Sequence, residues 1–342
     1  MKILFAIQGT GNGHISRARD LVPLLKEQAE TDVLISGIQA DVDPGFETQF
    51  RLHGMGFIFG KKGSVDFIRT FRKCITRRFL QEVRELPVDD YDLVINDFEP
   101  VSAWAARLKG IPCISLSHQY AVVHGNSPRS SKKDWMGKLI LAYYAPVQKG
   151  YGFHFQSYAP NIFTPVIRQE IRNLRVSTGN YVTVYLPAYD DERIIRVLEA
   201  IPGVQWQVFS RHCSKETKKN NIWIRPIENK AFLRSMAGSR AVLCGAGFET
   251  PAEALYLGKK LLVIPMKNQF EQQCNAAALE QMGVKTMKSL KRKHAPHIGE
   301  WLENGLSIRI QYPDLSRDLI RTILQDAREL PKPQPLSLMS FF

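Results

Sequence analysis

The sequence lacks the marks of several large protein classes. No run of about 18 apolar residues occurs, which excludes an ordinary transmembrane helix. The 5 cysteines are scattered and form no zinc-like pairs, so we expect reduced thiols, and neither a disulfide framework nor a zinc site. No Gly-Lys-Ser/Thr sequence is present, which excludes a P-loop. A strand-like segment begins directly after Met1, so we expect no signal peptide and a cytoplasmic location.

Acidic residues are outnumbered by basic ones, with 33 Asp and Glu against 46 Lys and Arg and a net charge of +13. Part of this excess lies in 61–84, where apolar residues recur at helical spacing beside arginines and lysines. A second basic and apolar segment occupies 131–144. Basic amphipathic helices bind anionic membranes, although a helix with its charges in solvent would have the same pattern. We expect peripheral contact with the inner face of the cell membrane, and no nucleic acid partner, because no nucleic-acid-binding module is recognisable.

The length of 342 residues, with 44% hydrophobic and 23% charged residues, predicts two globular domains. Short continuous apolar runs alternate with helical patterns, which is typical of α/β domains with parallel sheets. The predicted fold class is therefore α/β. We place an N-terminal domain at 1–160, a linker at 161–176, a C-terminal domain at 177–312, and a C-terminal helix and tail at 313–342.

A glycine-rich loop at 8–14 follows the first predicted strand and precedes a helix, an arrangement that often binds phosphate. A dinucleotide fingerprint would need a third glycine where His14 stands, so a dehydrogenase is disfavoured. Gly11 and Gly13 are donor-binding candidates in this loop. His14 is a candidate catalytic base, because a histidine can take a proton from an attacking hydroxyl near neutral pH. Its alternative role is to stabilise the loop by hydrogen bonding.

Polar side chains follow the next two predicted strands, whose carboxyl ends should lie at the ligand-binding edge of the sheet. Asp97 and Glu99 come at the end of one strand, and Asp97 is the alternative candidate for the base. Both acids also suit the N-terminal region of a helix, which is expected to begin directly after Glu99. His118 and Gln119 follow the strand at 111–117. Glu99, His118 and Gln119 are our acceptor-side candidates.

A second glycine turn lies between a predicted strand and a helix in the C-terminal half. Gly245 and Gly247 allow close approach of the backbone to a ligand, and Ala246 and Phe248 belong to the same turn. A diphosphate at the start of the following helix would meet free N–H groups and the positive end of the helix dipole. Thr250 and Glu253 lie in the first turns of that helix, where Glu253 can accept hydrogen bonds from a ribose diol.

Polar residues also follow the next apolar strand, at 261–265. Glu271, Gln272 and Asn275 offer donors and acceptors suited to sugar hydroxyls. Together with the glycine turn, they predict a pocket for a sugar nucleotide. The alternative is an ordinary βαβ unit with a glycine turn and a helix cap.

These motifs resemble the donor-binding region of GT-B glycosyltransferases, above all the peptidoglycan N-acetylglucosaminyltransferases and the UDP-glycosyltransferase superfamily. That region reads Gly-x-x-(Ser/Thr)-x-x-Glu, then Pro, then (Asp/Glu)-Gln-x-x-Asn. The matching residues here are Gly247, Thr250, Glu253, Pro265, Glu271, Gln272 and Asn275. The loop that ends at His14 is similar to the Gly-Gly-Thr-Gly-Gly-His loop of the peptidoglycan enzymes. Gly245 stands where many relatives have His or Arg, so phosphate binding would rely more on backbone amides.

The resemblance implies two Rossmann-like, doubly wound domains that face a cleft, with the C-terminal helix packed back on the N-terminal domain. It implies a UDP-sugar on the C-terminal domain, contacted near Ile227, and an acceptor hydroxyl over the N-terminal domain. The implied reaction is an inverting sugar transfer without metal or other cofactor, with a lipid or cell-envelope glycan as one suggested acceptor. Asp-x-Asp pairs at 41–43 and 90–92 have metal-binding spacing but lie outside the expected pocket. A UDP-sugar 2-epimerase and a non-catalytic sugar-nucleotide-binding subunit remain alternatives.

Overall fold

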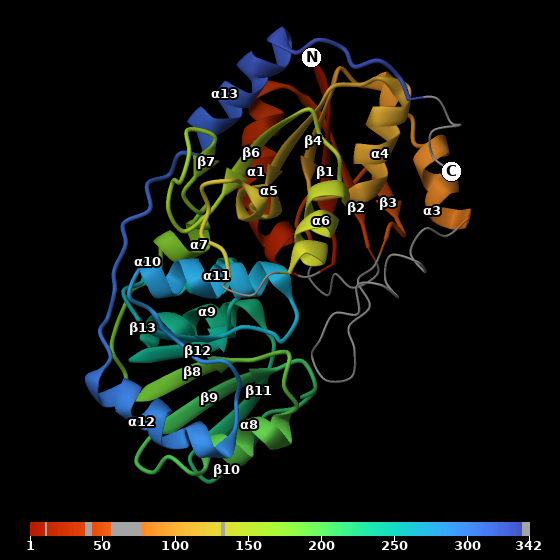
Figure 1. Cartoon of the computed structure of the whole chain (residues 1–342). Helices are drawn as coiled ribbons and strands as arrows, with labels where there is room; N and C mark the ends of the chain where they lie inside the picture. The colour runs from red at the N-terminus through yellow and green to blue at the C-terminus, as the bar shows by residue number, and fades with distance from the viewer. Residues whose placement is uncertain (11, 38–42, 56–76, 131–133, 337–342) are drawn as a thin grey trace.

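Two parallel sheets flanked by helices form the molecule, one above the other in Figure 1. The N-terminal sheet uses strands from residues 2–163 and the C-terminal sheet uses strands from 181–286. This arrangement confirms the predicted α/β class with two doubly wound domains. The computed structural model describes residues 1–10, 12–37, 43–55, 77–130 and 134–336.

The N-terminal sheet has the strand order β3-β2-β1-β4-β5-β6-β7, and all neighbouring strands are parallel. Its strands are β1 (Lys2–Gln8), β2 (Glu30–Ser36), β3 (Phe50–Leu52), β4 (Leu93–Asp97), β5 (Cys113–Ser117), β6 (Lys149–Phe153) and β7 (Ile162–Phe163). The winding direction reverses between β1 and β4. Ligands of such sheets bind at the carboxyl ends of the strands on either side of this reversal.

The C-terminal sheet has the order β10-β11-β9-β8-β12-β13-β14 and reverses between β8 and β12. Its strands are β8 (Tyr181–Tyr185), β9 (Gln205–Ser210), β10 (Thr217–Lys219), β11 (Ile222–Pro226), β12 (Ala241–Gly245), β13 (Lys260–Ile264) and β14 (Lys285–Thr286). The pairing of β10 with β11 is antiparallel and the other pairs are parallel.

The α-helices of the N-terminal half are α1 (Asn12–Gln28), α3 (Arg77–Glu85), α4 (Pro100–Lys109), α5 (His118–Val123), α6 (Trp135–Tyr143) and α7 (Gln169–Arg172). Those of the C-terminal half are α8 (Asp191–Leu198), α9 (Asn229–Gly238), α10 (Glu249–Tyr256), α11 (Phe270–Gln281), α12 (Ala295–Asn304) and α13 (Ser316–Glu329). Short 3-10 turns occupy η1 (Val88–Asp90) and η2 (Arg292–His294). None of the described helices is long and apolar enough to cross a membrane.

The first βα unit shows why these segments fold as they do. β1 is an almost unbroken apolar run and is buried from Ile3 to Gln8, as expected for a central parallel strand. In α1, the buried residues Ile15, Ala18 and Leu21 recur every three residues and form one face against the sheet. The glycine loop between the two elements therefore lies at the carboxyl end of the sheet.

The connection between the domains is more structured than the predicted linker at 161–176. It contains β7, which extends the N-terminal sheet, and the single turn of α7. It also carries Ile167, which is buried in an apolar cluster shared by both domains. The chain between the sheets is thus held by packing on both sides.

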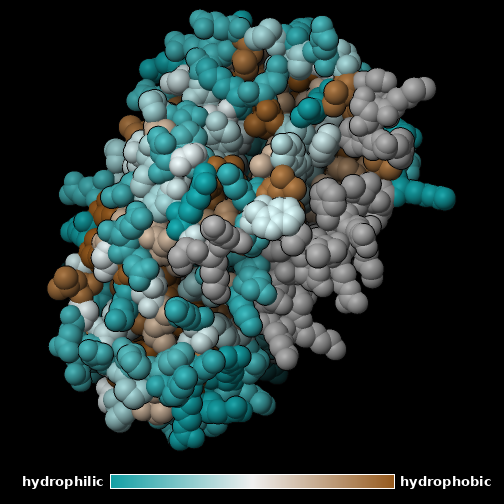
Figure 2. All heavy atoms as spheres, in the orientation of Figure 1, coloured by the Kyte–Doolittle hydropathy of each residue, from teal (hydrophilic) through white to brown (hydrophobic). Residues whose placement is uncertain are grey.

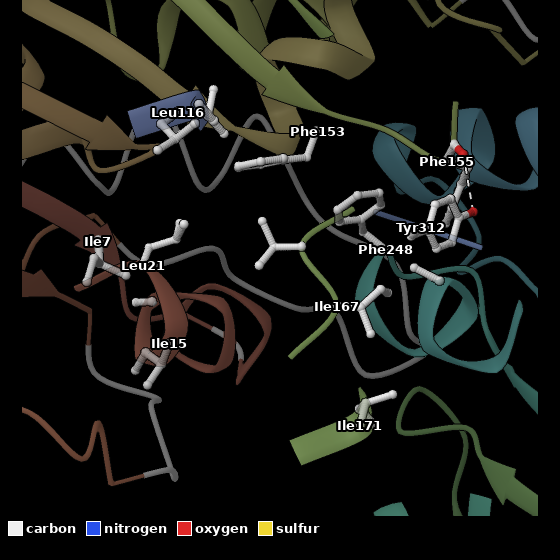
Figure 3. Close-up of a cluster of buried hydrophobic side chains, with 14 of the residues drawn as sticks. Ile7, Ile15, Leu21, Leu116, Phe153, Phe155, Ile167, Ile171, Phe248 and Tyr312 are labelled. Atoms are coloured by element: carbon white, nitrogen blue, oxygen red, sulfur yellow. Dashed lines mark hydrogen bonds between the residues drawn. The ribbon is translucent and has the colours of Figure 1, made fainter. Parts of the chain in front are cut away.

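Figure 3 shows the part of this shared cluster that lies between the domains, with Phe155, Ile167, Phe248 and Tyr312 close together. The rings of Phe155 and Phe248 have centroids 5.2 Å apart. The Tyr312 hydroxyl donates a hydrogen bond of 3.2 Å to the Phe155 carbonyl oxygen. Because these residues come from both domains and from the chain leading to α13, the two domains share one continuous core.

The last helix, α13, lies against α1 of the N-terminal domain, at the upper left of Figure 1. Its apolar face, including Leu319, Ile320 and Ile323, is buried. Arg317 forms an ion pair with Glu27 of α1 at 2.7 Å. The last described helix therefore packs on the N-terminal domain.

Candidate active site

The two sheet reversals direct their loops toward the same boundary between the domains. His14, in the first turn of α1 after β1, and Asp97, at the end of β4, flank the reversal of the N-terminal sheet. Gly245 ends β12 beside the reversal of the C-terminal sheet. Several contacts described below join these two regions, so they form a single site.

His14 and Asp97 form a hydrogen-bonded pair. Nδ1 of His14 lies 2.9 Å from Oδ1 of Asp97. Burial would raise the pKa of Asp97, but attraction to Arg17 and His14 outweighs it, and the net pKa is lowered. The carboxylate is therefore ionised and can only accept, so Nδ1 of His14 carries the donated proton. In the neutral form of the imidazole, the other ring nitrogen, Nε2, is then the acceptor.

Backbone geometry separates Asp97 from Glu99. Phe98, between them, has a φ of 57°, a left-handed conformation that is uncommon for a bulky residue. Its ring stacks on Tyr144 with centroids 4.7 Å apart, which helps to hold this conformation. The resulting turn lets Asp97 face the domain boundary while Glu99 begins α4.

Glu99, one of the predicted acceptor-side residues, lies at the start of α4. Its fully buried carboxylate accepts hydrogen bonds from the backbone N–H groups of Val101 and Ser102, at 2.8 and 2.7 Å, and from the Ser36 hydroxyl at 2.6 Å. It is thus the N-cap of α4. Both carboxylate oxygens of Glu99 are therefore engaged in contacts within the N-terminal domain.

Arg17, which sequence reasoning missed, joins the catalytic candidates to the other domain. It lies one helical turn after His14 and is 2% exposed. Nη2 of Arg17 donates to both carboxylate oxygens of Asp97, at 2.9 and 2.8 Å. Nη1 donates to Oε1 of Glu249, the first residue of α10. Arg17 therefore contacts one carboxylate from each domain.

Two further contacts cross the boundary from the start of α5. Nε2 of Gln119 donates to Oε2 of Glu271 at 3.1 Å and lies 3.4 Å from Nε2 of His14. Nε2 of His118 lies 2.9 Å from Oδ1 of Asn275, whose amide nitrogen donates to the Ala246 carbonyl oxygen at 3.1 Å. The predicted acceptor-side and sugar-binding residues thus meet directly in this structure.

His118 is buried beneath the glycine turn. Its ring stacks on that of Phe248, with centroids 3.9 Å apart and planes 9° apart. Nδ1 of His118 lies 2.7 Å from the Phe153 carbonyl oxygen, so both ring nitrogens face oxygen acceptors. Burial lowers the pKa of His118, although the negative charge of Glu271 opposes the shift. His118 is therefore an internal bridge between the domains.

The glycine turn leaves space beside its backbone. Among the described residues, a Cβ atom added to Gly247 would meet nothing within 4 Å, and one added to Gly245 would meet only atoms 3.9 Å or more away. The N-cap of α10, Phe248, supplies no side-chain cap for the backbone N–H groups of the first turn, where Thr250 is half-buried. In the described part of the chain, the turn therefore offers open volume beside a helix start without a side-chain cap, as a bound diphosphate would require.

Glu253 is held by an arginine from the connection between the domains. Nε and Nη2 of Arg168 both lie 2.7 Å from Oε1 of Glu253. Nη1 of Arg168 also donates to Oδ1 of Asn229 at 3.2 Å. Glu253 is 2% exposed. Its carboxylate is thus positioned by a residue that sequence reasoning did not single out.

The remaining candidates have varied positions. Oε1 of Gln272 accepts a hydrogen bond of 2.9 Å from the backbone of Met266 and so supports the loop after β13. Ile227 directly follows β11 and is 38% exposed. Gly13 lies in the first turn of α1, close to the side chain of Glu249. Gly11 lies outside the described residues, as do residues 41 and 42 of the first Asp-x-Asp pair. In the described part of the chain, no group of three or more His, Cys, Asp or Glu residues is arranged to hold a metal ion.

The missed residues carry weak sequence signals. Arg17 follows His14 at a spacing of three, which puts both on one helix face. Glu249 is an acid directly after a glycine turn, and Arg168 follows Pro165 in the predicted linker. Each signal is common by chance, and only the contacts between distant segments distinguish these residues.

Comparison with known proteins agrees with this architecture. Superposition on MurG of Acinetobacter baumannii has a TM-score of 0.59 with 12% sequence identity and covers 96% of this chain and 100% of that chain. For the glycosyltransferase SnogD from Streptomyces nogalater, the TM-score is 0.55 with 14% sequence identity, over 95% of this chain and 99% of that chain. For Arabidopsis thaliana UGT89C1 complexed with UDP, the TM-score is 0.54 with 14% sequence identity, over 96% of this chain and 94% of that chain. These likenesses confirm the expected GT-B fold.

Comparison of the amino-acid sequence identifies a family, whereas the structural likenesses show the fold alone. No curated protein sequence matches this chain. The family model described as glycosyl transferase family 1 matches residues 1–304. This match covers both sheets and all the site residues described above. The chain therefore belongs to glycosyl transferase family 1.

Proposed function

We propose that this protein transfers a sugar from a UDP-sugar to an acceptor hydroxyl, with inversion at the anomeric carbon. The observation that carries the proposal is the His14–Asp97 pair, at 2.9 Å, beside an open glycine turn on the other domain. A base and a leaving-group site on opposite sides of one boundary suit displacement at a sugar carbon held between them.

In this mechanism Nε2 of His14 removes the proton of the acceptor hydroxyl as its oxygen attacks the anomeric carbon. The new bond forms as the bond between that carbon and the diphosphate oxygen breaks, and UDP leaves with the electron pair. Asp97 accepts the hydrogen bond from Nδ1 and stabilises the imidazolium that forms. The 12% exposed side chain of His14 can be reached once the acceptor displaces Gln119.

The donor would lie on the C-terminal domain with its diphosphate at the start of α10. Backbone N–H groups and the helix dipole would stabilise the departing charge. Arg168 holds Oε1 of Glu253, and the second carboxylate oxygen would accept from the ribose. Support for uracil as the nucleobase of the donor comes from the structural likeness to a protein solved in complex with UDP.

We also propose that the acceptor is presented at a membrane surface. On α6, Trp135, Leu139 and Tyr143 recur every four residues and are 71%, 50% and 61% exposed. Figure 2 shows brown and nearly white atoms together over α6. Lys138 of the same helix is exposed. Aromatic, aliphatic and basic side chains on one short helix suit the interface of an anionic bilayer.

The basic segments predicted to contact the membrane are only partly described. Residues 56–76 and 131–133 lie outside the described part of the chain, so most of 61–84 does too. In α3, Phe79 and Val83 are buried and Arg77 and Arg78 are exposed, as in an ordinary amphipathic helix. The proposal of membrane contact therefore rests on α6.

A thermal-shift screen with UDP, GDP, TDP, their sugar conjugates and NAD tests the donor. A ligand that binds the folded state raises the melting temperature in proportion to the logarithm of its concentration once this exceeds the dissociation constant. We expect stabilisation by a UDP-sugar that is lost in Glu253→Ala. Product analysis with the stabilising donor then separates transfer from epimerisation, which would proceed without an acceptor. Stabilisation by NAD alone, or by no nucleotide, would contradict the proposal.

A further inference from the structure

We propose that Arg17 is a side-chain ligand of the donor diphosphate, and that Glu249 occupies its guanidinium until the donor binds. The inference rests on the proposed function and adds a contact from the N-terminal domain to the phosphate site. It also explains how the site can lack a basic residue at Gly245.

Arg17 is built as an anion ligand with one fixed partner and one exchangeable partner. Asp97 holds it in two hydrogen bonds within its own domain. Its contact with Glu249 instead crosses to the other domain. Nε of Arg17 is buried and has no hydrogen-bond partner among the described residues. A guanidinium with an unpaired donor and a carboxylate on a neighbouring donor is suited to a larger anion with more oxygens.

Glu249 lies where a phosphate group is expected. It is the first residue of α10 and comes two residues after Gly247, where an added Cβ would meet no atom of the described residues within 4 Å. A carboxylate at this position takes advantage of the helix dipole, as a phosphate would. Glu249 thus offers Arg17 the same kind of oxygen that the diphosphate would offer in its place.

A diphosphate that displaces Glu249 from Arg17 would be repelled by the negative charge of the Glu249 carboxylate. The charged and titratable groups facing it are Arg17 and His14 of α1, Arg168 of the domain connection, and Glu253 of α10 itself. Burial, with a contribution from Glu253, raises the pKa of Glu249 to about 7 against the opposing effect of Arg17. Glu249 can therefore become neutral by taking one proton near neutral pH, which would release Arg17 at little electrostatic cost.

Calorimetric titration with inorganic pyrophosphate and with UDP tests both parts. Glu249→Gln keeps the side-chain size and removes the charge, so it should bind both probes about tenfold more tightly than the wild type, the scale of one charge-assisted hydrogen bond. The wild type and Glu249→Gln are titrated with the same probe at each pH. The ionisation of the probe therefore affects both affinities equally and does not change their ratio. The ratio should be large above about pH 7 and approach one below it, as wild-type Glu249 becomes protonated.

Arg17 is tested in the Glu249→Gln background, where its removal leaves no unpaired Glu249 charge. Arg17→Gln should weaken pyrophosphate and UDP binding about tenfold or more, and Arg17→Lys should restore part of the loss. Binding of uridine, which has no phosphate, should not change. Glu280→Gln, on the exposed side of α11, is the matched control and should bind like the wild type.

The outcomes separate the inference from the proposed function. If UDP binds but Arg17→Gln has no effect in the Glu249→Gln background, the donor assignment stands and the inference is wrong. If pyrophosphate binding changes in the variants as expected and UDP does not bind, the diphosphate site stands and uracil is the wrong nucleobase. If neither pyrophosphate nor UDP binds any variant, above or below about pH 7, both proposals are wrong.

Discussion

Nδ1 of His14 lies 2.9 Å from Oδ1 of Asp97, and the same carboxylate accepts two hydrogen bonds from Arg17. The two interactions have different consequences for the carboxylate and for the ring. Pairing with an arginine makes Asp97 a weak base, because its net pKa is lowered. Hydrogen bonding to that carboxylate leaves Nε2 of His14 as the proton acceptor. The geometry thus favours His14 over Asp97 as the base.

Replacement of His14 by alanine should remove the proton acceptor while leaving the donor pocket in place. We expect kcat to fall by about a hundredfold or more, the usual contribution of a general base. Calorimetry should show donor affinity close to that of the wild type. His297→Ala, in α12 of the other domain, serves as the histidine control and should retain full turnover. Normal turnover in His14→Ala would contradict the assignment.

Gly247→Ala should separate ligand binding from stability. Apart from its two chain neighbours, the added methyl meets no atom of the described residues within 4 Å, so the melting temperature should stay near that of the wild type. The methyl would occupy the space proposed for the diphosphate, and we expect donor affinity to fall about tenfold or more. Gly152→Ala is the contrasting variant, because its Cβ would lie 2.7 Å from Cβ of Ala121 and should destabilise the fold. Unchanged donor affinity in Gly247→Ala would place the diphosphate elsewhere.

The Arg168–Glu253 pair should be costly to break from one side. Arg168→Met leaves the buried Glu253 carboxylate without its cation, and we expect a loss of about 3 kcal/mol in the free energy of unfolding. The change is measured by urea denaturation near pH 7. The double variant with Glu253→Gln should lose less than the sum of the two single losses, because it leaves no uncompensated charge. Additive losses would show that the two side chains do not interact.

His154 predicts a loss of stability in mild acid. Its ring is fully buried, Nδ1 accepts a hydrogen bond from the Phe155 N–H at 2.9 Å, and burial lowers the pKa of His154 well below 6.5. The unfolded chain binds this proton at higher pH than the folded protein does. The stability contribution is therefore complete above about pH 6.5 and is lost as the pH falls toward the lower folded-state pKa, by at most about 1.4 kcal/mol per pH unit.

The measurement is the free energy of unfolding in urea as a function of pH, for the wild type and for His154→Phe. The phenylalanine variant should show a shallower decline below about pH 6.5, because it has no proton to take up in the unfolded state. Identical pH profiles would mean that His154 does not remain neutral in the folded protein.

The exposed face of α6 predicts reversible membrane binding. The wild type should cosediment with anionic liposomes at low salt and much less with neutral ones, because the basic surface adds electrostatic attraction. Trp135→Ala combined with Leu139→Ala should reduce binding without lowering the melting temperature, since both side chains are at least half-exposed. Replacement of the exposed Leu306 by alanine is the control, because it lies outside α6. Equal binding by all three proteins would contradict the proposal.

The sequence by itself determined the α/β fold class and most of the strands and helices. Continuous apolar runs as short as the one in β1 favour a strand buried on both faces, and the spacing of Ile15, Ala18 and Leu21 is that of a helix face. Glycine turns mark backbone that a side chain would restrict, so a turn at Gly245 and Gly247 could be predicted from the sequence, and its binding of a ligand stays a prediction. These are local properties, set within a few residues along the chain.

Only the tertiary structure decided the roles of the polar residues. Asp97 ends β4 and Glu99 follows two residues later, yet the left-handed backbone of Phe98 between them leaves one at the domain boundary and makes the other a helix cap. Arg17 and Glu249 are 232 positions apart, and Arg168 and Glu253 are 85 apart. No local pattern encodes such contacts, because they arise when two separately wound domains bring their loops together. The sequence therefore shows which motifs the chain contains, and the fold decides which charged side chains pair with one another.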